Sequence, residues 1–109
     1  MAKRSGLYGE ERICIRCDRP YVHRHHIFYG TGRRSISERE GCWAYLCPEH
    51  HNMSNHGVHF DHAYDRRLKR DCQRRWVERE MAEEGIGHDE ATERFRSLFG
   101  RSYEEDEDL

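Results

Sequence analysis

Histidines gather in two short stretches of this chain. The stretch YVHRHHIFYG carries His23, His25 and His26, and the stretch EHHN carries His50 and His51. Imidazole changes its protonation near neutral pH and binds transition metals, so clustered histidines can move a proton or hold an ion. The alternative is a chance cluster on a polar surface. The residues around the two stretches distinguish these interpretations.

Cysteines flank the histidines at a regular spacing. Cys14 and Cys17 are three residues apart, and so are Cys47 and His50. Tight turns that each present two soft ligands are typical of a closed, tetrahedral zinc site. We predict a structural Zn²⁺ bound by these four residues, with no coordination position left for a substrate. The alternative is a set of buried thiols beside a surface histidine.

The apolar and glycine-rich runs predict a small domain of mixed type. Residues 21–28 and 42–47 are rich in aromatic and β-branched side chains, which favours two short strands. Three glycines and many charges between them predict a loop over residues 29–41. Pro48 suits the first turn of a helix, which we expect over residues 48–55. This order is a β-β-α unit with a zinc clamp at its base, and it brings the two histidine stretches together.

Two further helices are predicted downstream. Apolar residues stand four positions apart at 64, 68, 72 and 76, which predicts an amphipathic helix over residues 61–85. A last helix is expected from Asp89, as its N-cap, to Gly100, with Phe95 and Phe99 on its apolar stripe. The predicted fold class is therefore α+β, with a zinc-clamped ββα core followed by C-terminal helices.

A chain of 109 residues suits one domain, which we divide into four segments. Residues 1–12 are a polar lead-in, 13–60 the ββα core, 61–103 the two helices, and 104–109 an acidic tail expected to be disordered. Hydrophobic residues make up 35% of the chain and charged residues 37%. Because so small and polar a chain buries little apolar surface, a metal ion would help it to fold.

The N-terminal sequence MAKRSGLYGEER lacks the apolar centre of a signal peptide, and no run of 18 apolar residues is present. We therefore expect a cytoplasmic protein without a membrane segment. Thiols stay reduced in that compartment, which favours metal binding over disulfides for the five cysteines.

The elements CIRC (14–17), HHI (25–27) and LCPEHH (46–51) resemble the motifs of an HNH endonuclease of the ββα-metal superfamily, in its zinc-clamped subgroup. The match covers about residues 14–60. The C-terminal helices, with LFGRSY, are similar to those of small phage and prophage HNH proteins. The resemblance implies the ββα-metal fold, hydrolysis of DNA phosphodiester bonds, and a bacterial host or phage-infected cell as the setting.

The resemblance also assigns roles to residues. It implies His25 and His51 as ligands of a catalytic divalent ion, and His26 as the general base that activates water. His59, eight positions after His51, is a further candidate ligand of that ion. The ion is Mn²⁺, Ni²⁺, Zn²⁺ or Mg²⁺, and imidazole ligands favour the first three. Cys42 stands where the family has its middle asparagine, which normally tethers the loop that holds the base.

Basic side chains near these motifs predict contacts with a DNA backbone. Arg33 and Arg34 lie in the predicted loop beside the histidines, and residues 66–79 carry a net charge of +5. The contacts expected from this segment are Arg66, Arg67, Arg70 and Arg74. A solvated charged helix face is the alternative. Nothing in the sequence indicates readout of bases, so we expect little sequence specificity.

These observations predict a metal-dependent HNH-type DNA endonuclease that works with phage replication, recombination or packaging proteins. The alternative is a non-catalytic zinc-binding adaptor for DNA or protein, with a degenerate HNH fold. An adaptor needs the zinc ligands and the basic helix, but it has no use for a histidine base beside a second ion. His26 and His51 therefore favour the nuclease, whereas Cys42 favours the adaptor.

Overall fold

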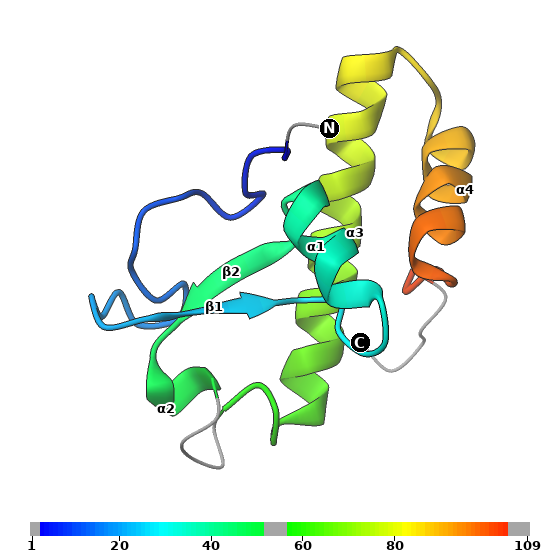
Figure 1. Ribbon diagram of the computed structural model, residues 1–109. Coiled ribbons are helices and arrows are strands. Elements are labelled where there is room, and N and C mark those ends of the chain that lie inside the picture. The colour runs from blue at the N-terminus through cyan, green and yellow to red at the C-terminus, as the bar shows by residue number, and fades with distance from the viewer. Residues whose placement is uncertain (1–2, 52–56, 105–109) are drawn as a thin grey trace.

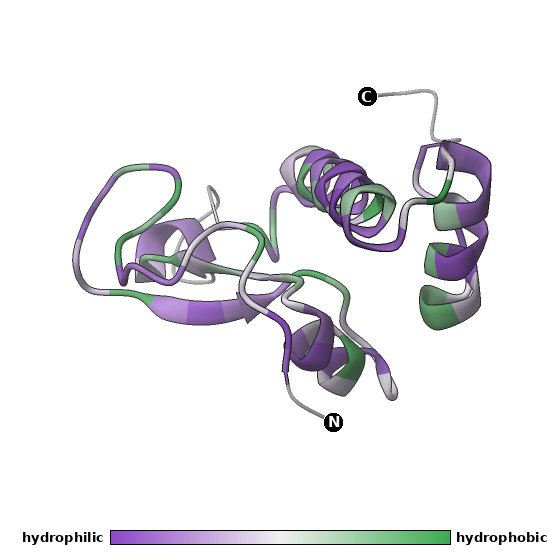
Figure 2. Cartoon of the chain, turned by 90° about the horizontal axis from the view of Figure 1, so that it is seen from above, coloured by the Kyte–Doolittle hydropathy of each residue, from purple (hydrophilic) through white to green (hydrophobic). Residues whose placement is uncertain are grey.

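The described part of the chain folds as a small sheet beside helices. The computed structural model describes residues 3–51 and 57–104, and within them it has one two-stranded antiparallel sheet and four helices. In chain order the elements are β1 (His23–His26), α1 (Arg33–Glu40), β2 (Trp43–Leu46), α2 (Pro48–His51), α3 (His62–Glu84) and α4 (His88–Phe99). The largely hydrophilic α3 lies between the sheet and α4 in both views (Figures 1 and 2). This architecture confirms the predicted α+β class.

The sheet places adjacent histidines on opposite faces. In the antiparallel register His26 lies opposite Trp43, and side chains alternate along a strand. His25 is accordingly buried in the core, at 2% exposed, while His26 is half-buried on the other face. Both strands are shorter than predicted. β1 ends because the backbone N–H and C=O of Phe28 bond to the Ser37 hydroxyl instead of to a strand.

The predicted loop over residues 29–41 is wrong, because most of it forms α1. Two of the three glycines that indicated a loop stand at the ends of this helix: Gly32 and Gly41 both have a φ of 79°, a left-handed conformation that glycine adopts readily. α1 contains a single apolar residue. Buried polar side chains hold it instead, namely those of Ser37 and Glu40.

α3 matches the predicted amphipathic helix. Asp61 caps its N-terminus by accepting the N–H of Tyr64, and Gly85 ends it in the left-handed conformation. Leu68 and Trp76, from the predicted stripe, are buried. Within the described residues α3 is the longest helix, and neither it nor any other has the apolar stretch that a membrane span requires.

An aromatic core joins α4 to the rest of the molecule. The Phe95 ring lies 5.6 Å from the Trp76 ring of α3, 5.3 Å from the Phe28 ring after β1, and 4.7 Å from the Phe99 ring, measured between centroids. Gly100 ends α4 as predicted, again with a positive φ. These contacts fix the end of β1 against the helices.

The predicted N-cap of α4 is wrong. The helix begins at His88 after Gly87, and no side chain caps it. Asp89 lies inside the first turn instead, where a carboxylate interacts favourably with the helix dipole without capping.

The N-terminal segment, predicted as a polar lead-in, ties α1 to α3. The Arg4 backbone N–H donates to the Arg39 carbonyl, and its guanidinium donates to Glu40 at 3.0 Å. The Tyr8 hydroxyl donates to Asp71 of α3 at 2.5 Å. The N-terminal segment thus packs against α1 and α3.

Two predictions extend beyond the described residues. α2 begins at Pro48 as expected, but residues 52–55 of the predicted helix lie outside the part of the chain that the structure describes. The same holds for residues 105–109 of the predicted acidic tail.

Candidate metal centres

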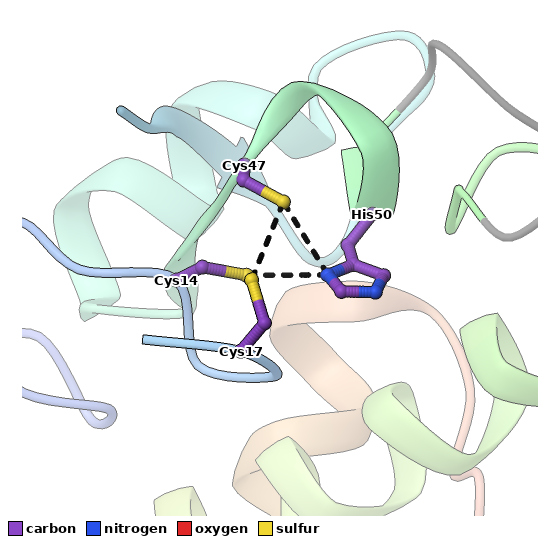
Figure 3. Close-up of side chains that lie close together, drawn as sticks. All are labelled: Cys14, Cys17, Cys47 and His50. Carbon is purple, nitrogen blue, oxygen red and sulfur yellow. Dashed lines mark hydrogen bonds between the residues drawn. The ribbon is translucent and has the colours of Figure 1, made fainter. Parts of the chain in front are cut away.

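The four predicted zinc ligands converge beside α2 (Figure 3). The sulfurs of Cys17 and Cys47 are 3.6 Å apart, and the sulfurs of Cys47 and Cys14 lie 3.3 and 3.6 Å from His50 Nδ1. A tetrahedral ion with ligands at about 2.0–2.3 Å needs ligand atoms roughly 3.3–3.8 Å apart. The four side chains therefore lie close enough together to hold a metal ion such as zinc.

Backbone bonds shape the turn that presents the first two thiols. Asp18 adopts a φ of 63°, and its N–H donates to the Cys14 carbonyl at 2.9 Å. The Cys14 N–H in turn donates to the Arg19 carbonyl at 2.9 Å. The predicted knuckle and turn are thus present, and they aim Cys14 and Cys17 at one point.

The surroundings of Cys14 favour the ionised form of its thiol. Burial opposes ionisation, but backbone N–H groups of Cys47 and Arg16 and the His50 side chain outweigh it and lower the pKa of Cys14 to about 6. The thiolate is the form that binds a metal. The surroundings of this cluster therefore favour the metal-binding state.

A second cluster consists of His25, His51 and His59. The Nε2 atoms of His51 and His59 are 3.1 Å apart, and the ring of His25 lies 5.3 and 5.2 Å from theirs, between centroids. His25 Nε2 is buried without a hydrogen-bond partner. Buried polar nitrogens are normally paired, so an unpaired one aimed at two other imidazoles fits a ligand of an ion. The three ligand atoms lie close enough to hold one.

Main-chain bonds bring His59 to this cluster. The N–H of Val58 donates to the His50 carbonyl at 2.8 Å, and the N–H of His59 donates to the His51 carbonyl at 3.3 Å. The chain after Gly57 thus returns to α2. His50 and His51, adjacent on α2, belong to different clusters.

Burial keeps His25 and His51 of the histidine cluster neutral. Burial, followed by the neighbouring charges of His51, His59 and Lys69, lowers the pKa of His25 to about 3. Burial also lowers the pKa of His51 to about 4, with His59 and His23 as further causes. Neutral imidazole is the metal-binding form, so protons compete weakly for these sites.

The histidine cluster opens into a cavity of about 420 Å³. Its lining residues are Arg24, His25, His26, Tyr29, Arg34, His51 and His59. Although His25 and His26 leave β1 on opposite faces, both line this cavity, because they stand at the end of the strand. The structure therefore brings the predicted base and the predicted ligands to one space.

A carboxylate that the sequence did not indicate holds the predicted base. His26 Nε2 lies 2.7 Å from Glu38 Oε1 on α1. The other carboxylate oxygen accepts from Arg24 at 2.6 Å and from Lys3 at 3.4 Å. Glu38 was missed because its segment was predicted to be a loop, in which no residue has a defined partner.

His23 was assigned no role, yet it touches the second cluster. Its Nδ1 lies 3.1 Å from His51 Nδ1, so one ring donates and the other accepts. A histidine that binds a metal through one nitrogen usually bonds through the other to an outer partner. The period-two spacing of His23 and His25 is the sequence signal for a shared face.

The two arginines predicted to stand beside the histidines differ in position. Both are exposed on α1, but Arg34 lines the cavity, whereas the guanidinium of Arg33 lies beside Gly100 at the end of α4. The structure therefore brings only Arg34, of this pair, to the histidines.

Some of the basic side chains of residues 66–79 are engaged in contacts within the protein. Arg74 and Arg75 form ion pairs with Asp71, and Arg79 donates to backbone carbonyls. Arg66 and Arg67 are exposed. A surface hollow of about 820 Å³ is lined by Arg67, Arg70, Asp71, Arg74 and Glu104.

No known protein family has a model that matches this chain, and no curated protein or solved structure matches it either. The function proposed below therefore rests on the two clusters and on the cavity into which the histidine cluster opens.

Proposed function

We propose that the protein is a metal-dependent endonuclease of the HNH type that hydrolyses DNA phosphodiester bonds. One observation carries the proposal: His26 lines the same cavity as the three clustered imidazoles. The cavity thus combines a candidate ion site with a separate proton acceptor. The order β1, α1, β2, α2 also contains the two strands and following helix of the ββα order that the motifs imply, with α1 in the connection between the strands.

We assign the residues of the cavity to different steps of phosphodiester hydrolysis. An imidazole can accept a proton from water near neutral pH, and His26 is the residue we assign to this step. Arg34 brings positive charge to the same space, which suits a phosphate. A divalent ion on His25, His51 and His59 would stabilise charge on the phosphate and on the leaving oxygen.

The thiol cluster, which consists of Cys14, Cys17, Cys47 and His50, has a structural role in this proposal. Three cysteines and one histidine complete a tetrahedral shell, so a zinc ion there would leave no position for a substrate. It would join the knuckle at Cys14 to α2 and so hold His51 in place. We therefore assign the thiol cluster to a structural Zn²⁺.

A backbone bond supplies a tether where the family has an asparagine. Cys42 is fully buried, and its carbonyl accepts the N–H of Ile27, the residue after the proposed base, at 3.0 Å. The Cys42 N–H donates to the Ser37 carbonyl of α1 at 2.8 Å. The start of β2 therefore ties α1 to the chain beside His26 without an amide side chain.

The first experiment measures nicking and linearisation of supercoiled plasmid in metal-free buffer and with Mg²⁺, Mn²⁺ or Ni²⁺. We expect metal-dependent cutting by the wild type. We expect His26→Ala to lower the rate by about 10²- to 10⁴-fold, the usual contribution of a general base. The matched control is His88→Ala, which removes an exposed histidine on α4 and should cut normally.

Two results would overturn the assignment. His26→Ala cutting at the wild-type rate would remove the base. A wild type that cuts with none of the metals, yet holds one zinc tightly, would favour the non-catalytic adaptor. Two facts favour that second function: Cys42 replaces the asparagine, and two arginines of α3, Arg74 and Arg75, are paired with Asp71 of the same helix.

A further inference from the structure

The ring of His26 is held by a carboxylate that the proposed mechanism does not use. α1 lies against the end of β1 (Figure 1), and Glu38 of α1 reaches His26 Nε2 with Oε1 at 2.7 Å. On the basis of the proposed function, we propose that Glu38 is a positioning residue for the base: it fixes His26 in the tautomer whose Nδ1 can accept a proton.

The tautomer follows from what each atom can donate. An ionised carboxylate only accepts hydrogen bonds, so Nε2 must carry the hydrogen and Nδ1 keeps a lone pair. Glu38 is ionised over the working range. Burial opposes ionisation, but bonds from His26, Arg24 and Lys3 outweigh it and lower the pKa of Glu38 to about 2.

Glu38 is itself held from the other side. Its Oε2 accepts from Arg24 at 2.6 Å and from Lys3 at 3.4 Å. The Arg24 guanidinium lies 3.8 Å from the centroid of the Trp43 ring and donates to the Tyr45 hydroxyl at 3.2 Å. Two donors and an aromatic face thus fix which oxygen of Glu38 meets His26.

A positioned base needs such a partner here. His26 is at the end of β1 with a side chain 28% exposed, so packing alone leaves its ring free to turn. Proton transfer depends on the orientation of the accepting nitrogen, and a wrong tautomer cannot accept at all. The single hydrogen bond between His26 and Glu38 fixes both the orientation of the ring and its tautomer.

Glu38→Gln tests this inference with almost no change in shape. Arg24 and Lys3 only donate, so they take the amide oxygen and leave the amide NH₂ facing His26. Nε2 must then accept, and the ring hydrogen moves to Nδ1. We expect kcat to fall by about 10²-fold with KM and zinc content unchanged, because the loss concerns the transition state alone.

Ring ¹⁵N NMR of the neutral imidazole supplies a readout that does not depend on cutting. The His26 signals, identified by their absence in His26→Ala, should report Nε2–H in the wild type and Nδ1–H in Glu38→Gln. The matched control is Glu93→Gln, an exposed position on α4 that should keep both the rate and the tautomer.

The outcomes separate this inference from the proposed function. A wild type that cuts beside a Glu38→Gln variant of equal kcat would overturn the inference alone. So would an Nδ1–H tautomer in the wild type, whatever the variant does. Absence of cutting by the wild type with every metal would overturn the proposed function, and the catalytic role of Glu38 with it.

Discussion

The thiol cluster and the histidine cluster contain neighbouring residues, His50 and His51 respectively, yet they offer a metal two different environments. The first provides four ligands, and two of its thiols, Cys14 and Cys47, are at most 1% exposed. The second provides three imidazoles beside a cavity of about 420 Å³. A closed shell suits a structural ion, whereas a shell with an open position suits a reactive one. One short helix can thus present both kinds of site.

Breaking the thiol cluster is expected to have the largest effect. Zinc contributes about 10–16 kcal/mol to small zinc domains, which is at least as large as the roughly 5–15 kcal/mol stability of a typical domain. We therefore expect Cys14→Ser to unfold the chain or lower its melting temperature steeply. Circular dichroism and the zinc content would measure this. The control Cys42→Ala removes a buried thiol outside both clusters and should keep its zinc. Unchanged melting and zinc in Cys14→Ser would exclude a structural ion.

Breaking the histidine cluster should affect catalysis and leave the fold. Loss of an outer partner of a metal ligand already lowers activity by about 10–100-fold. We expect His51→Ala, which removes a ligand, to lower plasmid cutting by at least about 10²-fold with the melting temperature retained. The exposed His62→Ala serves as control. If His51→Ala unfolded as Cys14→Ser is expected to, the contrast between the clusters would be wrong.

Glu40 belongs to a common frame, the contacts among α1, α3 and the N-terminal segment, and weakening it should lower the stability of the fold without favouring either cluster. Glu40 accepts from Trp76 Nε1 at 3.1 Å and from Arg4 at 3.0 Å, and it joins α1, α3 and the N-terminal segment. We expect Glu40→Gln to lower the free energy of unfolding by about 2–3 kcal/mol, because it weakens bonds to a buried charge. Urea denaturation would measure the loss. Metal content at the two clusters should be unchanged, and a selective loss at one would contradict a common frame.

The same residue predicts how stability depends on pH. Burial opposes ionisation of Glu40, but the bonds from Trp76, Arg4 and Arg39 outweigh it and lower its pKa below the ordinary value of 4.5. The folded chain therefore holds this proton less tightly than the unfolded chain. The contribution of Glu40 is complete above pH 4.5 and is lost as the pH falls through the lowered pKa. Below pH 4.5, urea midpoints of the wild type and Glu40→Gln should converge, and a constant difference would refute this.

The smallest effect is expected on the basic surface. Arg66 and Arg67 are exposed on α3, so alanine at both should weaken DNA binding several-fold and reduce the slope of log affinity against log salt by about 2. Fluorescence anisotropy at several salt concentrations would measure both. Arg74→Ala is the control, because Asp71 already pairs with that charge. An unchanged slope would place the DNA on another surface.

Local spacing was enough to predict the ligand sets. A turn of four residues brings Cys14 and Cys17 together whatever the rest of the fold does, and the first turn of α2 does the same for Cys47 and His50. The convergence of His25 with His51 needed one more step, the pairing of two strands, which the aromatic and β-branched runs indicated. Each pair of neighbouring ligands thus follows from contacts close in sequence, whereas the meeting of the pairs depends on the pairing of the two strands.

The partner of His26 could not be predicted in this way. α1 has a single apolar residue, so no periodic pattern marks it as a helix. Its stability comes from distant groups, such as Ser37 bonded to Phe28 and Glu40 bonded to Trp76 of α3.

α2 is only four residues long, and His50 and His51 are both on it. An ion on the thiol cluster would restrain the backbone that carries His51, so the two sites would be coupled allosterically. Such coupling is reciprocal: whatever factor zinc adds to the affinity of the histidine cluster, an ion there adds to the affinity for zinc. Loss of zinc would then weaken the binding of the second ion together with the fold.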